Sequence, residues 1–277
     1  MVRLAKQLSL ATAAAAALVG AQLGLGATLS GCGETGGKRI TLSTEVVVAQ
    51  GATQSFFNDH GWQIQFTQAY LSVGALYYFT GPPVVAHNNS LPHWKGFLTI
   101  PTAHAHPGHY SEGDALGEMV EPQTINLLDP DFLAPSEAVT GHYESARFTF
   151  QNPPEGELAP MLESHVILIE GQASKENVTI SFRATADESD ILNADGNPFV
   201  EGCVFKVVDI ESSGKVTLTI HPEVWFDQVD FSLVSPSENG EPVNLTPGEI
   251  PHKAFVRGLK KGTAYDFAFV ADSSPSN

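Results

Sequence analysis

Short apolar runs separated by Gly, Pro, Asn and Ser make up most of the chain after Gly33, and no segment there keeps a helical period. Val178–Ala184 and Val216–Ile220 alternate strictly between apolar and polar residues, which predicts strands with one core face and one solvent face. Gln63–Gln68 alternates in the same way, and the chain then stays apolar through Ala69–Phe79, so we expect this stretch to enter the centre of the fold. The pattern predicts an all-β fold, an antiparallel β-sandwich.

The same pattern gives the bounds of the expected strands. They are Ile40–Ala49, Gln63–Tyr70, Gly74–Phe79, Phe97–Ile100, Ser145–Phe150, His165–Glu170, Val178–Ala184, Cys203–Ile210, Lys215–Ile220, Gln228–Leu233, Ala254–Leu259 and Ala264–Val270. Tyr77, Tyr78 and Phe79 are expected in the core. Trp225 and Phe226 are expected to close one end of the sandwich. His60 and His252 are expected to be exposed in polar turns, and His221, which precedes a proline, is expected to be a turn residue and not a ligand.

Residues 81–142 interrupt this pattern with eight prolines and little periodicity. We interpret them as a long loop insertion, and long loops inside a domain are usually either functional or disordered. A short helical turn is expected around Asp114–Met119, and Pro135 resembles a helix start. The insertion is therefore the segment in which we look for function.

The densest histidine cluster of the chain lies in this insertion, where His104, His106 and His109 place three of the ten histidines within six residues. An extended His-x-His directs both rings to one face, and Pro107 and Gly108 bend the chain so that His109 can turn toward the same point. Neutral imidazole is a common metal ligand, and copper(II) binds most tightly of the divalent ions at nitrogen sites. We therefore predict a copper site, with zinc as the alternative ion.

Further histidines would complete the ligand set from neighbouring segments. We expect His142 and His93 in this role, and His165 is a further candidate. Trp94 would cover a copper(I) ion by a cation–π contact, and the carboxylates expected to orient the imidazoles are those of Glu112, Asp114 and Glu118. The other interpretation of these residues is a solvated loop that binds no metal.

The N-terminal segment has the layout of a secretory signal peptide, because Arg3 and Lys6 precede an uncharged run of Ala, Leu, Val and Gly that extends to Leu29. Its length also suits a transmembrane anchor. Leu29-Ser-Gly-Cys32 resembles the bacterial lipobox, which implies cleavage before Cys32 and acylation of its thiol. Since Gly33, and not Asp, follows the cysteine, the resemblance implies an outer-membrane lipoprotein that faces the periplasm or the cell exterior.

This interpretation divides the chain into a signal peptide (1–31), a tether (32–39), one sandwich domain (40–271) and a frayed tail (272–277), although the length also permits two domains. Without Arg3 and Lys6, 12 Lys and Arg face 31 Asp and Glu, a net charge of −19. Nucleic acid is therefore not an expected partner, since phosphate binding needs clustered basic side chains. Cys203 is expected to be a buried, inert core residue.

Three segments also resemble a known family. Gly61–Phe79, Gly141–Phe150 and Tyr265–Phe269 are similar to the strand pattern of secreted MbnP-like proteins. The resemblance implies a periplasmic β-sandwich associated with copper binding, in some members through His and a modified Trp. It covers about half of the chain after the signal peptide, and it assigns no ligand residue by residue.

Other functions compete with metal binding and delivery. His104-x-His106-x-x-His109 resembles the zinc motif of metallo-β-lactamase-type hydrolases, but Gly108 stands where that motif has Asp. A cupredoxin-like electron-transfer site would need His and Met close after Cys203, and neither is there. A structural or interaction lipoprotein without metal is the remaining alternative. We expect a binding protein and not an enzyme, since no nucleophile motif is present.

Overall fold

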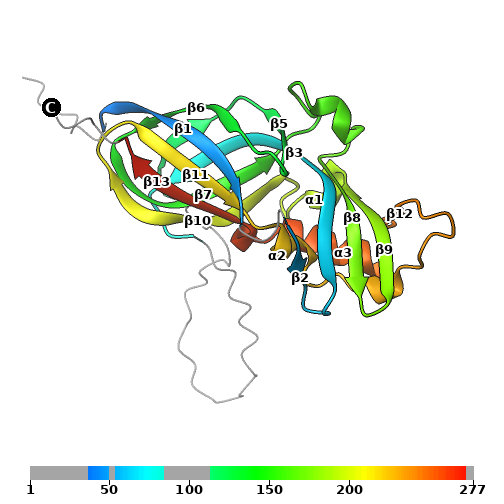
Figure 1. Cartoon of the computed structure of the whole chain (residues 1–277). Coiled ribbons are helices and arrows are strands. Elements are labelled where there is room, and N and C mark those ends of the chain that lie inside the picture. The colour runs from blue at the N-terminus through cyan, green and yellow to red at the C-terminus, as the bar shows by residue number, and fades with distance from the viewer. Residues whose placement is uncertain (1–36, 50–53, 84–112, 273–277) are drawn as a thin grey trace, which may run out of the picture. The chain divides into compact units, whose positions relative to one another are not determined.

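The computed structural model describes residues 37–49, 54–83 and 113–272. These residues form a mostly β structure, which confirms the predicted all-β, sandwich-like class (Figure 1). The strands are β1 Arg39–Val48, β2 Phe56–Phe57, β3 Gln63–Phe79, β4 Ala115–Met119, β5 Gln123–Asn126, β6 Phe132–Val139, β7 Gly141–Phe150, β8 Ile167–Lys175, β9 Val178–Ala186, β10 Phe199–Ile210, β11 Gly214–Ile220, β12 Val243–Asn244 and β13 Tyr265–Ala271. The helices are α1 Glu188–Ile191, α2 Pro222–Phe226 and α3 Ile250–Leu259, with 3-10 turns at η1 Ala159–Leu162, η2 Phe231–Leu233 and η3 Gly262–Ala264.

The long strand β3 belongs to two groups of strands. Its C-terminal half pairs with β4 on one side and β7 on the other, and the path β3-β4-β6-β1-β11-β13-β10-β7 returns to β3, so these strands close into a ring. Its N-terminal half pairs with β8, which continues to β9 and β12. Two predicted strands, Gln63–Tyr70 and Gly74–Phe79, are thus one strand of 17 residues.

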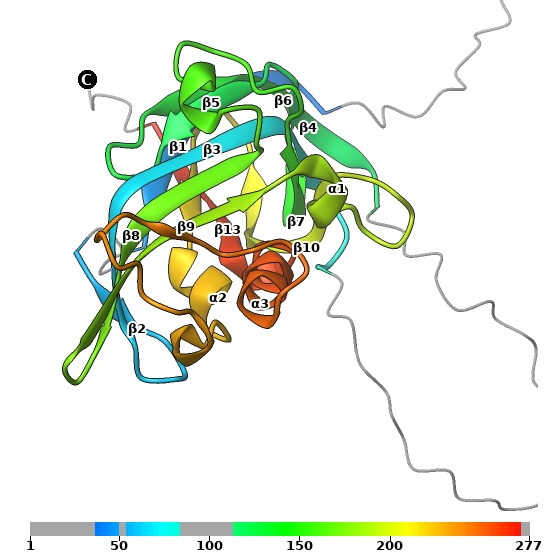
Figure 2. The same ribbon diagram turned by 90° about the vertical axis from the view of Figure 1, so that its right-hand side faces the viewer.

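Helices α2 and α3 pack against the group formed by β3, β8 and β9 (Figure 2). Phe226 of α2 is the centre of this contact, with its ring 5.4 Å from Phe182 of β9, 5.1 Å from Phe255 of α3 and 5.5 Å from Phe66 of β3. Aromatic pairs at these centroid distances add stability beyond their buried area. Trp225 and Phe226 are fully buried, as a role in closing one end of the core requires.

The interior of the ring is largely aromatic. Tyr78, Phe205 and Phe267 pack on one another with ring centroids 5.6 to 6.2 Å apart. The hydroxyl of Tyr78 is satisfied by Thr44 at 3.1 Å and Ser136 at 3.2 Å, so the phenol is buried without an unpaired polar atom. Tyr78 and Phe79 are buried, which confirms their predicted place in the core, whereas Tyr77 is only partly buried.

Two predicted strands are not strands, and the sheet is not purely antiparallel. Ala254–Leu259, predicted as a strand, belongs to helix α3, where the buried Pro251, Ala254, Phe255, Gly258 and Leu259 recur at helical spacing. Gln228–Leu233, also predicted as a strand, is a turn that ends in η2, whose first turn is capped by the Asp230 carboxylate accepting from the Ser232 amide. The sheet is also mixed and not purely antiparallel, because β1–β11, β10–β13 and β12–β9 are parallel pairs.

The predicted insertion is not loop throughout, because its part after residue 113 contains β4, β5 and β6. The expected helical turn at Asp114–Met119 is strand β4, and Pro135 lies inside β6 instead of starting a helix. Pro135 is tolerated there because it falls at the register shift between β1 and β6, where the strand ladder is interrupted. The predicted strand Phe97–Ile100 lies outside the described residues.

Within 37–49, 54–83 and 113–272, no helix has the length and apolar character that a membrane crossing requires.

Candidate metal centre and the histidine–carboxylate pairs

The predicted metal site falls largely outside the described residues. His93, Trp94, His104, His106, His109 and Glu112 lie there, and so does the predicted lipidation site Cys32. His142, Asp114 and Glu118 are described: Asp114 directly precedes β4, Glu118 lies within β4, and His142 is at the start of β7. Glu118 is exposed and directly opposite Glu137 of β6. Among the described residues, no hydrogen bond or ion pair joins the carboxylate of Asp114 or of Glu118 to a histidine.

His142 is at the start of β7, and its imidazole is about half exposed, at 48%. Its Nδ1 lies 2.8 Å from Oδ1 of Asp209, which is its direct partner across the β7–β10 pair. An ionised carboxylate only accepts hydrogen bonds, so Nδ1 carries the proton and donates it. The lone pair of Nε2 is then left for a ligand, which is the orientation that metal-binding histidines usually have.

The stem of the segment 84–112 is held close to the same strand. Thr80 and Asp114 face each other across it, with the Thr80 amide donating to the Asp114 carbonyl at 3.2 Å and the Asp114 amide donating to Thr80 Oγ1 at 3.2 Å. The Ser145 hydroxyl donates to the Gly81 carbonyl at 2.6 Å. Ser145 is three residues from His142 along β7, a separation of roughly 10 Å at the rise of a strand.

Gly113 explains why this stem can be so tight. Its φ of +77° is in the left-handed region, and a Cβ there would lie 2.8 Å from the Gly81 amide nitrogen and clash with Thr80 Oγ1. Asp114, predicted to orient a metal-bound imidazole, thus holds the stem through its backbone.

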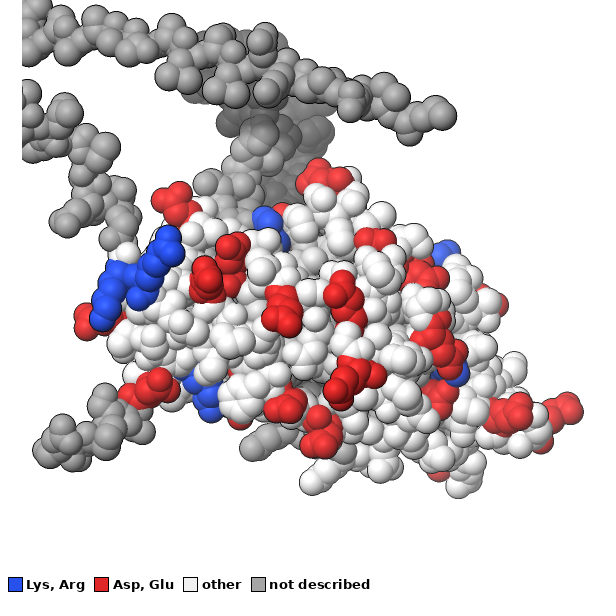
Figure 3. All heavy atoms as spheres, turned by 90° about the horizontal axis from the view of Figure 1, so that it is seen from above, with Lys and Arg blue, Asp and Glu red and all other residues white. Residues whose placement is uncertain are grey.

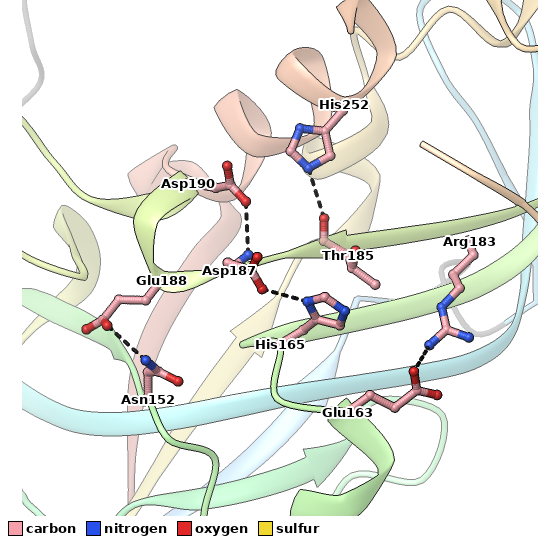
Figure 4. Close-up of polar contacts among 9 residues, drawn as sticks. All are labelled: Asn152, Glu163, His165, Arg183, Thr185, Asp187, Glu188, Asp190 and His252. Carbon is pink, nitrogen blue, oxygen red and sulfur yellow. Dashed lines mark hydrogen bonds and ion pairs between the residues drawn. The ribbon is translucent and has the colours of Figure 1, made fainter. Parts of the chain in front are cut away.

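A second histidine–carboxylate pair lies where β8 begins and β9 ends (Figure 4). His165 Nδ1 is 2.6 Å from Asp187 Oδ1. Asp187 is also the N-cap of α1, where its side chain and that of Asp190 form a capping box. His165 was a further candidate ligand, and among the described residues its contact ties the turn before β8 to the cap of a short helix.

The backbone that leads into His165 is unusual, since Glu163 and Ser164 both have positive φ, 51° and 77°. Glu163 is held by Arg183, with Nη2 2.6 Å from its carboxylate, while Arg183 Nη1 lies 3.1 Å from Glu170. The hydrogen bond from Arg183 lowers the pKa of the Glu163 carboxyl. This ion-pair network fixes the turn in the left-handed conformation that non-glycine residues otherwise avoid.

His221 contacts two carboxylates and therefore has no free ring nitrogen. Its Nδ1 lies 2.9 Å from Glu223 Oε1, and its Nε2 lies 3.0 Å from Asp266 Oδ2 of β13. The hydrogen bond to Glu223 is the largest of the effects that raise the pKa of His221. It was predicted to be a turn residue and not a ligand, and it precedes the first turn of α2 as a charged link between that helix and β13.

The remaining described histidines, His60 and His252, have no carboxylate partner in the described hydrogen bonds, and they and the described cysteine, Cys203, differ in their exposure. His60 is exposed, as predicted. His252 was predicted to be exposed, but it is 2% exposed at the start of α3 and donates from Nε2 to the Thr185 carbonyl at 3.1 Å. Cys203 is fully buried, as predicted, and its Sγ lies 3.4 Å from the Val200 carbonyl.

Acidic side chains spread over the face seen in Figure 3 and do not gather in one patch. The described surface has two depressions, with volumes of about 540 Å³ and 410 Å³. The larger lies over β1, β4 and β6 and includes Arg39, Glu118 and Glu137; the smaller includes Glu121, Asp129, Asp131 and Glu157. Neither is lined by a histidine.

In the described part of the chain, no three His, Cys, Asp or Glu side chains are grouped so that they could hold a metal ion. Three histidine–carboxylate pairs join residues that are far apart in the sequence: His142–Asp209 by 67 positions, His165–Asp187 by 22 and His221–Asp266 by 45. No local sequence motif therefore predicts these pairs. Only a correct strand pairing of β7 with β10 would have predicted the first.

No family model and no curated protein sequence match the chain. Among solved structures, it is similar to MbnP from Methylosinus trichosporium, with 8% sequence identity and a TM-score of 0.38. The similarity covers 84% of this chain and 99% of that one.

Proposed function

We propose that this protein is a lipid-anchored extracytoplasmic protein that binds copper, or alternatively zinc, for storage or delivery and not for turnover of a substrate. The observation that carries the proposal is the spacing His104-x-His106-x-x-His109, which offers three imidazole donors within six residues. Cys32 would be the acylated anchor.

Two features of the described residues support a site in this part of the chain. The stem of the segment 84–112 is closed by the Thr80–Asp114 contact and fastened to β7 through Ser145. On the same strand, His142 is exposed and presents Nε2 outward because Asp209 engages Nδ1. A donor of this kind suits copper(II) and zinc, so His142 fits the ligand role predicted for it.

The experiment is a measurement of metal content by mass spectrometry on the full-length protein, purified without an affinity tag from its native host. We expect about one copper per chain, in keeping with a single site. A His104→Ala/His106→Ala variant should lose the metal, whereas His60→Ala, which removes an exposed histidine of the described fold, should keep it.

A metal-free wild-type protein that also takes up neither copper(I), copper(II) nor zinc would refute the proposal. The function would then be that of a tethered structural or interaction protein. Zinc at unit stoichiometry would replace copper as the ion and leave the site in place.

A further inference from the structure

The smaller surface depression, of about 410 Å³, is lined by acidic residues and by no Lys, Arg or His. Its exposed carboxylates are those of Glu121, Asp129, Asp131 and Glu157. The ion pairs among the described residues use other carboxylates, so no basic side chain of the described fold contacts these four. The larger depression differs, because Arg39 is part of its lining.

Thr124 adds an independent observation, a buried polar group without a partner. It lines the same depression, it is 2% exposed, and its Oγ1 makes no hydrogen bond. Neighbouring side chains of a strand point to opposite faces, and Ile125 belongs to the core, so Thr124 faces away from the core and toward the depression. A buried hydroxyl that lacks a partner indicates a water, ion or ligand that completes it.

The backbone around Thr124 explains why this hydroxyl is buried. Its amide donates to the Glu155 carbonyl at 2.8 Å, which holds the segment that includes Gly156 and Leu158 against the free edge of β5. Its direct partner on β3, Ser72, is fully buried and also has a hydroxyl without a partner. Two neighbouring hydroxyl oxygens therefore have unused lone pairs at this position of the sheet.

We propose that the smaller depression binds a linear polyamine, a methylene chain that carries several ammonium groups. Ammonium groups only donate hydrogen bonds, and they match the carboxylates and the Thr124 hydroxyl as acceptors. Pro122 and Leu158 are apolar residues of the lining that the methylene groups can contact. The volume lies within the roughly 300 to 1,000 Å³ usual for small-molecule sites.

The spacing of the carboxylates favours such a ligand over a metal ion. Among the described residues, no three His, Cys, Asp or Glu side chains are grouped so that they could hold one ion. Charges that are spread around a depression suit cationic groups that are spread along a chain. This site is separate from the proposed copper site and uses none of its residues.

The test is isothermal titration calorimetry of the purified full-length protein with spermidine, in about 150 mM salt, which screens attraction between exposed charges more than about 8 Å apart. We expect saturable binding. Asp129→Asn/Glu157→Gln should weaken it about tenfold or more, because charge-assisted hydrogen bonds are lost. Neither side chain has a hydrogen bond or ion pair within the described residues, so the substitutions remove charge and no structural contact.

Thr124→Val tests the buried hydroxyl, because valine keeps the shape and removes the oxygen. Spermidine affinity should fall several-fold. The thermal midpoint of the ligand-free protein should not fall, since the hydroxyl has no protein partner to lose. A lower midpoint together with unchanged spermidine affinity would overturn the assignment of this depression, because the hydroxyl would then serve the fold alone.

A matched control separates this site from general attraction to an acidic protein. Glu137→Gln/Glu211→Gln removes the same number of exposed carboxylates outside the depression and should leave the affinity unchanged. Three results overturn the proposal: a wild-type protein that binds no spermidine, equal weakening in the two double variants, or wild-type affinity in Asp129→Asn/Glu157→Gln. None of them bears on the copper site, which metal content tests separately.

Discussion

At the level of single residues, the described histidines that contact carboxylates differ in how many of their ring nitrogens are engaged. His142 and His165 each have one contact, through Nδ1, while His221 is bracketed on both sides. A histidine with both nitrogens engaged is stabilised as the imidazolium and acts as a charged link. The single contact of His142 leaves the donor that metal chemistry needs.

The double contact of His221 predicts a pH dependence of stability. Its pKa is raised in the folded protein, chiefly by the hydrogen bond with Glu223, so the stabilisation is complete below the unfolded pKa near 6.5 and is lost as the pH rises through the higher folded value. In urea titrations at about pH 6 and about pH 8, the wild type should lose more unfolding free energy between the two than His221→Gln.

Glu223→Gln serves as the companion variant, because it removes the largest cause of the shift and should reduce the same pH difference. Identical pH dependence in the wild type and both variants would contradict the role assigned to this link.

At the level of elements, α3 shows how a tertiary contact fixes a residue that local propensity disfavours. Gly258 lies in this helix, where glycine costs about 1 kcal/mol relative to alanine. A Cβ at Gly258 would come within 2.5 to 2.7 Å of the backbone of Trp225 and Val224 in α2. The glycine is therefore required by the close approach of the two helices.

Gly258→Ala is expected to destabilise the protein despite the better helix propensity of alanine. Overpacking against backbone atoms typically costs about 1 to 3 kcal/mol and exceeds the propensity gain. Chemical denaturation measures the difference, and Lys253→Ala, at an exposed position of the same helix, should change stability by less than about 0.5 kcal/mol. A more stable Gly258→Ala protein would show that α2 and α3 separate at little cost.

At the level of the whole molecule, the strand ring has a packed interior, so a metal site is expected at the surface. Aromatic side chains such as Tyr78, Phe205 and Phe267 pack inside the ring, so its interior is part of the hydrophobic core. The formal net charge of −17 concentrates cations near the protein and repels anions. Both features are compatible with a site for a metal ion outside the core.

Metal binding at such a site predicts a shift in global stability. A ligand that binds only the folded state adds about 2.7 kcal/mol at a hundredfold excess over its dissociation constant. Copper should therefore raise the thermal midpoint of the wild type and not that of His104→Ala/His106→Ala. An unchanged wild-type midpoint, with and without chelator, would instead favour the interaction protein that binds no metal.

The sequence by itself determined the fold class and most strand positions, because strict alternation in segments such as Val178–Ala184 reports which face is buried. It also singled out the histidine spacing at residues 104–109, since that signal is local. It misassigned Ala254–Leu259 because a short apolar run fits both a strand and a buried helix.

Only the tertiary structure decided what depends on residues distant in the chain. The prolines of residues 81–142 obscured the strand pattern of β4, β5 and β6, whose pairing partners include β1 and β3. The Asp209–His142 pair exists because antiparallel pairing brings two positions 67 residues apart face to face. Local pattern encodes which residues face the core, whereas strand register decides which side chains meet, and register is set by the packing of the whole sheet.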